Sequence, residues 1–216
     1  MTSPDPTPKL PPRYELLRPL GEGGMASTFL VKDRFDSRVV ALKLLTGRTR
    51  DPQLTEALRE EFALLTQVRH PNIARVHDFG ATRRAEDGQV YYTSDFVDGV
   101  SLDRQVAGKA WNDVAPLIGQ LLEALEVLHR AGIRHGDLKS ENLLVEKTGR
   151  LVVIDLGCAR VFRPDKGAIH ELCGTKGSIA PELLEGATGD GRSDFYSLGI
   201  LLSELVPTLS HSDDFE

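Results

Sequence analysis

Hydrophobic and polar positions alternate in two different ways along this chain of 216 residues. From Tyr14 to Val97, short apolar runs bounded by glycine, proline or charged residues predict β-strands. After Asp98-Gly99, apolar residues recur at intervals of three and four, which is the spacing of amphipathic helices. The pattern therefore predicts a strand-rich first part and a mostly helical second part.

The strand-rich part is expected to begin with a hairpin over residues 14–31, because apolar residues flank a glycine cluster on both sides. Residues 82–88 are charged and predict an exposed loop. The other strands expected in this part lie at residues 38–45, 73–79 and 90–97.

Three segments are expected to be helices, with a buried strand at residues 151–154 between the last two. The first starts at Asp51-Pro52, a capping acceptor followed by proline. The second is capped by Asn112 and ends at Ala131-Gly132, and the third covers residues 194–205. The apolar positions at helical spacing in the first helix are Leu54, Leu58, Phe62, Leu65 and Val68.

Composition excludes several functional classes. A net charge of −6 argues against broad nucleic-acid binding, and no apolar run approaches the ~20 residues that span a bilayer. The first 13 residues are rich in proline and predict a disordered leader rather than a signal peptide. Two cysteines, Cys158 and Cys173, are too few for a disulfide framework. We therefore expect a cytoplasmic protein with two unpaired thiols, and a redox link between them is the alternative.

The polar residues best suited to chemistry lie between Ile133 and Leu144. This stretch carries the carboxylate of Asp137, the ammonium of Lys139 and the carboxamide of Asn142 on one short turn. Phosphoryl transfer needs mainly positioning and charge neutralisation, which these three groups can supply. Taken alone, the stretch also fits an ordinary turn whose polar residues face water.

Three other positions fit the same chemistry. The glycine cluster from Gly21 lets backbone N–H groups approach phosphates, although a plain glycine-rich hairpin reads the same way. Lys43 lies inside an apolar strand, so it must reach the surface or meet an anion, and Glu61 is a candidate ion-pair partner. Asp155 follows a buried strand and precedes Gly157, which suits either a metal ligand or a tight turn.

In this order, the motifs resemble those of a protein kinase catalytic domain, of the bacterial Ser/Thr type, from about Tyr14 to Leu205. The resemblance implies an α+β fold of two lobes with Mg²⁺ and ATP between them. The first lobe would be a small β-sheet with one main helix, and the second mostly helical and C-terminally shortened. The implied boundaries are a leader at 1–13, the N-lobe at 14–97, a partial C-lobe at 98–209 and a polar tail at 210–216.

The resemblance also implies roles for individual residues. Asp137 would be the catalytic base and Lys139 the phosphoryl-stabilising cation, and Thr175 would accompany Ser/Thr specificity. Asn142 and Asp155 would hold Mg²⁺. The implied nucleotide-binding residues are Gly21, Glu22, Gly23, Gly24, Thr28, Ala41, Lys43, Glu61, Ser94, Asp95, Val97 and Leu144.

Three structural roles follow from the resemblance as well. Asp194 would brace the catalytic loop from beneath, and Glu182 would pair with an arginine from helices that lie beyond Leu205 in the family. An apolar column would link the lobes through Leu65, Val76, His135 and Leu156.

Several residues depart from the family pattern. Gly136 replaces the arginine that usually receives an activation-segment phosphate, and the segment from Cys158 to Gly174 holds no Ser, Thr or Tyr. We therefore predict activity that does not depend on phosphorylation between Asp155 and Gly174. The other departures are Thr28 for valine, Leu156 for phenylalanine and Ser178 for tyrosine.

Three functions remain open from the sequence. The first is a Ser/Thr protein kinase, since the reacting groups are retained. The second is a pseudokinase or interaction module, because the short second lobe would leave the apolar helix at 194–205 uncovered and open to a partner. The third is a small-molecule kinase of the aminoglycoside or choline type, whose loop His135-Gly136-Asp137 resembles.

Overall fold

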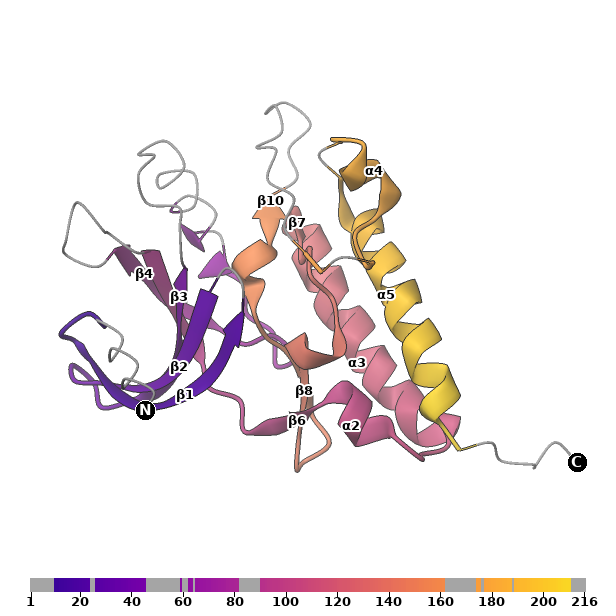
Figure 1. The fold of residues 1–216 in the computed structure, drawn as a ribbon, viewed down its shortest axis with the longest axis horizontal. Helices are drawn as coiled ribbons and strands as arrows, with labels where there is room; N and C mark the ends of the chain where they lie inside the picture. The colour runs from indigo at the N-terminus through magenta and orange to yellow at the C-terminus, as the bar shows by residue number, and fades with distance from the viewer. Residues whose placement is uncertain are drawn as a thin grey trace, which may run out of the picture. The chain divides into compact units, whose positions relative to one another are not determined.

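The computed structural model describes residues 10–23, 26–45, 59, 62–63, 65–81, 90–161, 174–175, 177–187 and 189–210 (Figure 1). The chain divides into two compact units. The first unit consists of residues 1–66 and 75–96, and the second of residues 67–74 and 97–216. Strands and helices occur in both, so the α+β class is confirmed.

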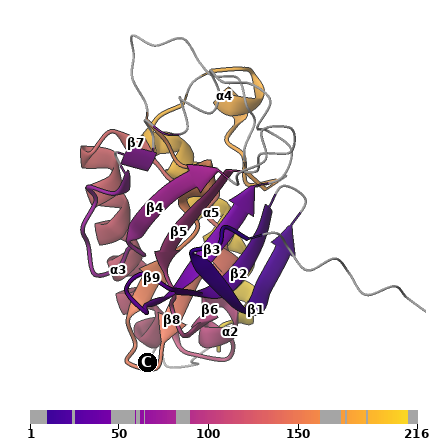
Figure 2. The ribbon, with the colours of Figure 1, turned by 90° about the vertical axis from the view of Figure 1, so that its left-hand side faces the viewer.

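The first unit is built on an antiparallel sheet whose strands follow the order β1-β2-β3-β5-β4 (Figure 2). The hairpin predicted over residues 14–31 is confirmed, and so is the strand predicted at residues 38–45. The strand predicted from Ile73 begins only at Val76, because Ile73 forms a parallel bridge with Val153. The sheet consists of β1 (Tyr14–Gly23), β2 (Ala26–Asp33), β3 (Val39–Leu45), β4 (Val76–Ala81) and β5 (Val90–Asp95).

The end of β5 also differs from the prediction. The strand stops at Asp95, whereas the apolar pattern extends to Val97. The apolar pattern extends to Val97 because this residue packs with Ala74 and Val152 in a buried cluster of the second unit. Sequence periodicity alone does not separate that packing from a continued strand.

The first unit contains two groups of packed apolar side chains. One face forms a core cluster of Tyr14, Phe29, Val31, Val40, Leu42 and Leu44. Elsewhere in this unit, Phe62 stacks against Phe79 with 4.9 Å between ring centroids, and it packs against the tilted ring of Tyr92 at 4.7 Å. Phe62 and Leu65 are helical and buried, as predicted. The predicted start of their helix at Asp51 lies outside the described residues.

The second unit combines two small sheets, of order β6-β8-β9 and β10-β7, with four helices among its described residues. The sequence pattern missed β6 and α2, since elements of three and five residues are too short to show a period. The elements are β6 (Gly99–Ser101), α2 (Leu102–Val106), α3 (Trp111–Arg130), β7 (Ile133–Arg134), β8 (Leu143–Glu146), β9 (Leu151–Val153), β10 (Arg160–Val161), α4 (Pro181–Leu184) and α5 (Gly191–Leu205), with 3₁₀ turns at Ser140–Asn142, Leu156–Cys158 and Val206–Thr208.

The helix starts differ from those predicted. Ala110 is the N-cap of α3, so Asn112 lies within the first turn and is not the cap. The predicted end at Ala131-Gly132 is confirmed, and Gly132 has the positive φ of 71° that suits a helix terminus. α5 begins three residues earlier than predicted, because the side chain of Asp190 accepts the Arg192 N–H at 2.8 Å and caps it.

Leu121, Leu125 and Leu128 are fully buried along α3, and Leu201 is buried in α5. These apolar stripes form the helical core of the second unit, and His129 near the end of α3 contacts the first turn of α5. Over the described ranges, no helix is both long and apolar enough to cross a membrane.

Candidate active site

A cluster of polar side chains surrounds Asp137, in the segment that connects β7 to β8. The Thr175 hydroxyl donates to one Asp137 carboxylate oxygen at 2.7 Å, and Lys139 Nζ lies 2.9 Å from the other. Lys139 Nζ also donates to the Thr175 hydroxyl at 3.0 Å. Three candidate residues from positions 137 to 175 are thus brought into direct contact.

The protonation state of Asp137 follows from these contacts. Burial alone would raise its pKa, but hydrogen bonds from Lys139 and Thr175 outweigh burial and hold the pKa below its ordinary value. The carboxylate is therefore ionised at neutral pH. It can accept a hydrogen bond from a hydroxyl group that approaches it.

Asn142 is oriented by the same carboxylate. Its Nδ2 donates to the main-chain oxygen of Asp137 at 2.8 Å and to Asp137 Oδ2 at 3.1 Å. These bonds use the amide nitrogen, so the amide oxygen is left to contact another group, such as a cation. Asn142 is 5% exposed, which keeps the amide in one orientation.

Asp155 lies at the same end of the β8-β9 pair as Asn142. Leu143 pairs with Val153, and the next residue, Ile154, donates its N–H to the main-chain oxygen of Asn142 at 2.8 Å. Asp155 itself has a positive φ of 59°, unusual for a non-glycine residue and frequent at functional sites.

The donor set at Asn142 and Asp155 fits a hard cation. Mg²⁺ prefers oxygen ligands and commonly takes only one or two protein groups, with phosphate and water completing its shell. No group of three or more His, Cys, Asp or Glu side chains that could cage a metal occurs in the part of the chain that the structure describes. The residues present suit a magnesium ion that arrives with a phosphate ligand.

Asp194 fixes the segment that carries Asp137, as predicted. Its buried carboxylate accepts the N–H groups of His135 at 2.8 Å and Gly136 at 2.9 Å, and contacts His129 Nε2 at 2.8 Å. Burial acts to raise the pKa of Asp194, but these bonds, led by His129, hold it below its ordinary value. Two consecutive N–H groups bound to one carboxylate fix the local backbone.

His135 adds a second constraint from within the segment. Its Nδ1 accepts the N–H of Asp137 at 3.2 Å. Its Nε2 lies 3.2 Å from the main-chain oxygen of Ile154, so that nitrogen is the donor. The fully buried ring therefore ties the chain before Asp137 to the chain before Asp155.

Gly136 stands where no other residue fits. Its φ is 80°, and a Cβ at this position would lie 2.6 Å from the main-chain oxygen of Cys158. The close approach of the Leu156–Cys158 turn is a physical reason for the missing arginine. The expectation of an unpaired thiol at Cys158 is wrong, because Cys158 is disulfide-bonded.

In the first unit, strand register brings candidate nucleotide-binding residues onto one face of the sheet. Thr28 lies opposite Lys43, and Ala41 lies opposite Ser94. Residues directly opposite each other in an antiparallel pair share a face, and residues two apart on one strand do as well. Lys43 and Ala41 therefore occupy the face opposite the core residues Leu42 and Leu44 of the same strand.

Other candidates are placed less completely. Gly21, Glu22 and Gly23 form the end of β1, and Gly21 pairs with Thr28. Leu144 packs against the buried cluster that contains Val97. Gly24 and Glu61 lie outside the described residues, so the Lys43–Glu61 pair stays a prediction. The column of Leu65, Val76, His135 and Leu156 consists of buried residues from both units and also stays a prediction.

Sequence reasoning missed two contacts at this site. His129 contributes to the Asp194 cluster although it lies on α3, and the only hint is a histidine in the last turn of an apolar helix. Ser193 donates a hydrogen bond to Glu182 at 2.7 Å. The local sequence, in which Ser193 directly precedes Asp194, did not indicate this contact.

The sheet with its glycine hairpin and strand lysine, and the second unit with its bonded Asp137, Lys139 and Asn142, define a kinase-like α+β protein. The chain belongs to the protein kinase family, since a family model of the protein kinase domain matches residues 14–213.

Curated relatives agree with this assignment. The chain is 34% identical over 211 residues to putative CBL-interacting protein kinase 27 of Oryza sativa subsp. japonica, covering 94% of this chain and 51% of that protein. It is 37% identical over 201 residues to CBL-interacting protein kinase 19 of the same organism, covering 90% and 39%. A bacterial relative, the probable serine/threonine-protein kinase PknB of Lactococcus lactis subsp. lactis (strain IL1403), is 32% identical over 201 residues, covering 90% and 31%. The chain thus spans about half or less of the length of these relatives.

Proposed function

We propose that this chain is the catalytic domain of an ATP-dependent Ser/Thr protein kinase that transfers the γ-phosphoryl group to protein hydroxyls. The observation that carries the proposal is the Asp137 carboxylate, bonded at once to Lys139 and Thr175. The printed name of the PknB relative, a probable serine/threonine-protein kinase, supports the same substrate class.

In this mechanism Asp137 orients the substrate and receives its proton. A serine or threonine hydroxyl donates to the carboxylate, its oxygen bonds to the γ-phosphorus, and the bond from that phosphorus to the ADP oxygen breaks. The hydroxyl proton passes to Asp137. Lys139, which lies 2.9 Å from Asp137, balances negative charge on the moving phosphoryl group.

Several of the candidate residues would hold the nucleotide. Lys43 would bind the α- and β-phosphates, and the main chain of Gly21 to Gly23 would cover them. The main chain of Asp95 and Val97 binds the adenine. Asn142 and Asp155 would hold Mg²⁺, which would supply positive charge to neutralise the phosphates.

Activity would not require phosphorylation of the segment between Asp155 and Gly174. This segment holds no Ser, Thr or Tyr, and Gly136 removes the usual phosphate receptor. The backbone before Asp137 is instead fixed by Asp194, through two N–H groups that need no modification. Phosphopeptide mapping that found a required site in this segment would contradict the idea.

A pseudokinase or interaction module is the second candidate. Exposed apolar side chains favour it, since Leu184 is 62% and Phe195 51% exposed on α4 and α5. Exposed apolar side chains of this kind suit a protein partner that covers them. A cytoplasmic location would go with either function. A small-molecule kinase is the third candidate, because the loop His135-Gly136-Asp137, with glycine at position 136, resembles that of aminoglycoside and choline kinases.

The deciding experiment measures phosphate transfer from radiolabelled ATP to a generic protein substrate, for the parent and Asp137→Asn. Glu123→Gln, an exposed carboxylate-to-amide change on α3, is the matched control. We expect loss of at least about 100-fold in Asp137→Asn and none in the control. Nucleotide binding without transfer in the parent would favour the pseudokinase, and transfer only to small alcohols or sugars would favour the third candidate.

A further inference from the structure

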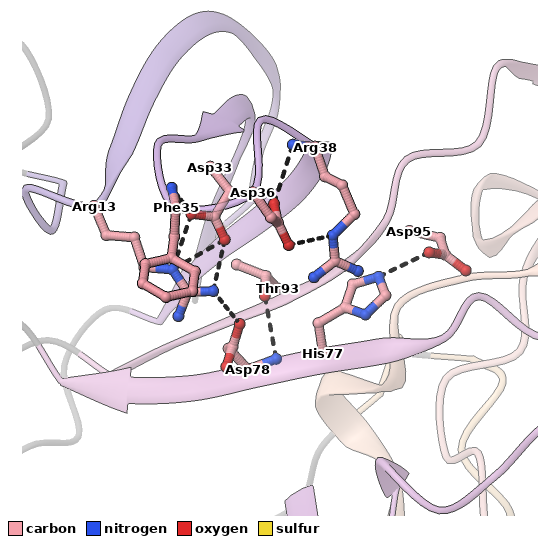
Figure 3. A network of polar contacts seen from close by, with 9 residues as sticks. All are labelled: Arg13, Asp33, Phe35, Asp36, Arg38, His77, Asp78, Thr93 and Asp95. Carbon is pink, nitrogen blue, oxygen red and sulfur yellow. Dashed lines mark hydrogen bonds and ion pairs between the residues drawn. The ribbon is translucent and has the colours of Figure 1, made fainter.

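The last residues of the first unit, Asp95 and Phe96, are tied down by side chains from two other strands. The Asp95 carboxylate accepts the Arg75 N–H at 3.1 Å. It also contacts His77 Nε2 at 2.8 Å (Figure 3). A carboxylate only accepts, so the imidazole nitrogen is the donor. The Asp95 N–H in turn donates to the Arg75 oxygen at 2.9 Å.

A β-bulge aims His77 at Asp95. In the β4-β5 ladder, Val76 pairs with Ser94, but the next regular pair is Phe79 with Tyr92. His77 and Asp78 therefore share the space opposite a single residue, Thr93, whose hydroxyl accepts the Asp78 N–H at 3.2 Å. Bulges of this kind re-aim side chains and are frequent beside functional sites.

A second irregularity accompanies the contact to Phe96. In the β1-β2 ladder, Leu16 pairs with Val31 and Arg18 with Leu30, so Leu17 is the extra residue. The guanidinium of Arg18, directly after it, lies 5.8 Å from the centre of the Phe96 ring. This is a cation–π distance.

The His77 side chain is 9% exposed, whereas its partner and Arg18 face the solvent. The Asp95 side chain is 50% exposed, and Arg18 is exposed as well. Their effect is to restrict the backbone of two consecutive residues at the point where the sheet ends.

We propose that His77 and Arg18 are positioning residues that hold the main chain of Asp95 and Phe96 in place for the adenine of ATP. The inference rests on the proposed function, because it assigns these residues to the nucleotide-binding edge of that site. His77 acts through the Asp95 carboxylate and Arg18 through the Phe96 ring; neither touches the reacting atoms.

The test compares steady-state kinetics of the parent with His77→Ala, Asp95→Ala, their double variant and Arg18→Ala. Each single change should raise KM for ATP about three- to tenfold, with kcat within about twofold. The double His77/Asp95 variant should be no worse than either single one, because the two side chains act as one contact. Arg38→Ala, which breaks an exposed ion pair with Asp36 in the same unit, should leave KM unchanged.

Rescue separates positioning from general stability. His77→Gln carries an amide nitrogen at about the reach of imidazole Nε2, so it should restore most of the parent KM. Amide hydrogen exchange without nucleotide should be faster in His77→Ala at residues 94–97 and unchanged in β2.

Each outcome has a defined meaning. An unchanged KM in His77→Ala and Asp95→Ala, in a parent that turns over ATP, overturns the positioning proposal alone. Parallel loss of kcat, KM and unfolding midpoint, without rescue by glutamine, assigns His77 a merely structural role and also overturns it. A parent that binds no nucleotide overturns the proposed function, and this inference with it.

Discussion

Ser193 donates a hydrogen bond of 2.7 Å to the carboxylate of Glu182, which joins the first turn of α5 to α4. Ser193 is only 2% exposed. The resemblance to the kinase family led us to expect an arginine partner for Glu182 from beyond Leu205. In this chain, a serine eleven residues after Glu182 supplies a donor within the described structure.

Ser193→Ala should therefore lower the free energy of unfolding by about 1–3 kcal/mol, because a carboxylate loses its buried donor. Ser203→Ala is the matched control on the same helix, since its hydroxyl donates to Ile200 at an exposed position. The control should change stability by less than about 0.5 kcal/mol. Urea denaturation measures both, and equal effects would show that the Glu182 contact is unimportant.

Gly136→Ala should be more destabilising than a glycine replacement with the same backbone strain. Gly136 and Gly149 have nearly equal φ values, 80° and 82°, but a Cβ at 149 would meet nothing within 4 Å. At 136 it would meet the Cys158 oxygen at 2.6 Å. We expect Gly136→Ala to lose about 2 kcal/mol more than Gly149→Ala in denaturation experiments. A difference near zero between the two variants would show that the turn at Cys158 shifts to accommodate the added methyl group at little cost in free energy.

Asp194 should make stability depend on pH in the acid range. Its folded pKa lies below the ordinary value, so the unfolded chain binds more protons there and stability falls as pH drops below about 4. Asp194→Asn should lose about 3 kcal/mol at neutral pH. Its acid slope should be shallower than the parent's, because one of several carboxylates with a lowered pKa is removed, and the two curves should approach each other at low pH.

Glu123→Gln controls for this comparison, because it changes an exposed carboxylate on α3 without touching the Asp194 cluster. It should follow the parent curve. An unaltered acid slope in Asp194→Asn would assign the pH dependence to other carboxylates.

The sequence predicted best what depends on local order. Residues 38–45 form a nearly unbroken apolar run around Lys43, and Asp137, Lys139 and Asn142 lie close together on one short turn, so both segments could be recognised from local order. Thr175, 38 residues from Asp137, was assigned only because the family places it there, and its 2.7 Å contact agrees.

What the sequence could not predict depends on contacts between distant segments. The approach of Cys158 to Gly136, and the donation from Ser193 to Glu182, leave no periodic signal. The bulge that turns His77 toward Asp95 requires the register of β4 against β5. Asn112 was mistaken for a cap because residue preference marks a helix start only to within a few positions.

Lys43→Met should separate catalysis from folding. Lys43 is partly buried on the face of β3 opposite Leu42 and Leu44, and methionine keeps an unbranched side chain of similar length without the charge. If Lys43 binds the phosphates of ATP, transfer should fall at least about 100-fold while the free energy of unfolding changes by less than about 1 kcal/mol. Lys32→Met, an exposed position on β2, should alter neither quantity. Equal loss of activity and stability in Lys43→Met would mean that this lysine holds the sheet together rather than the nucleotide.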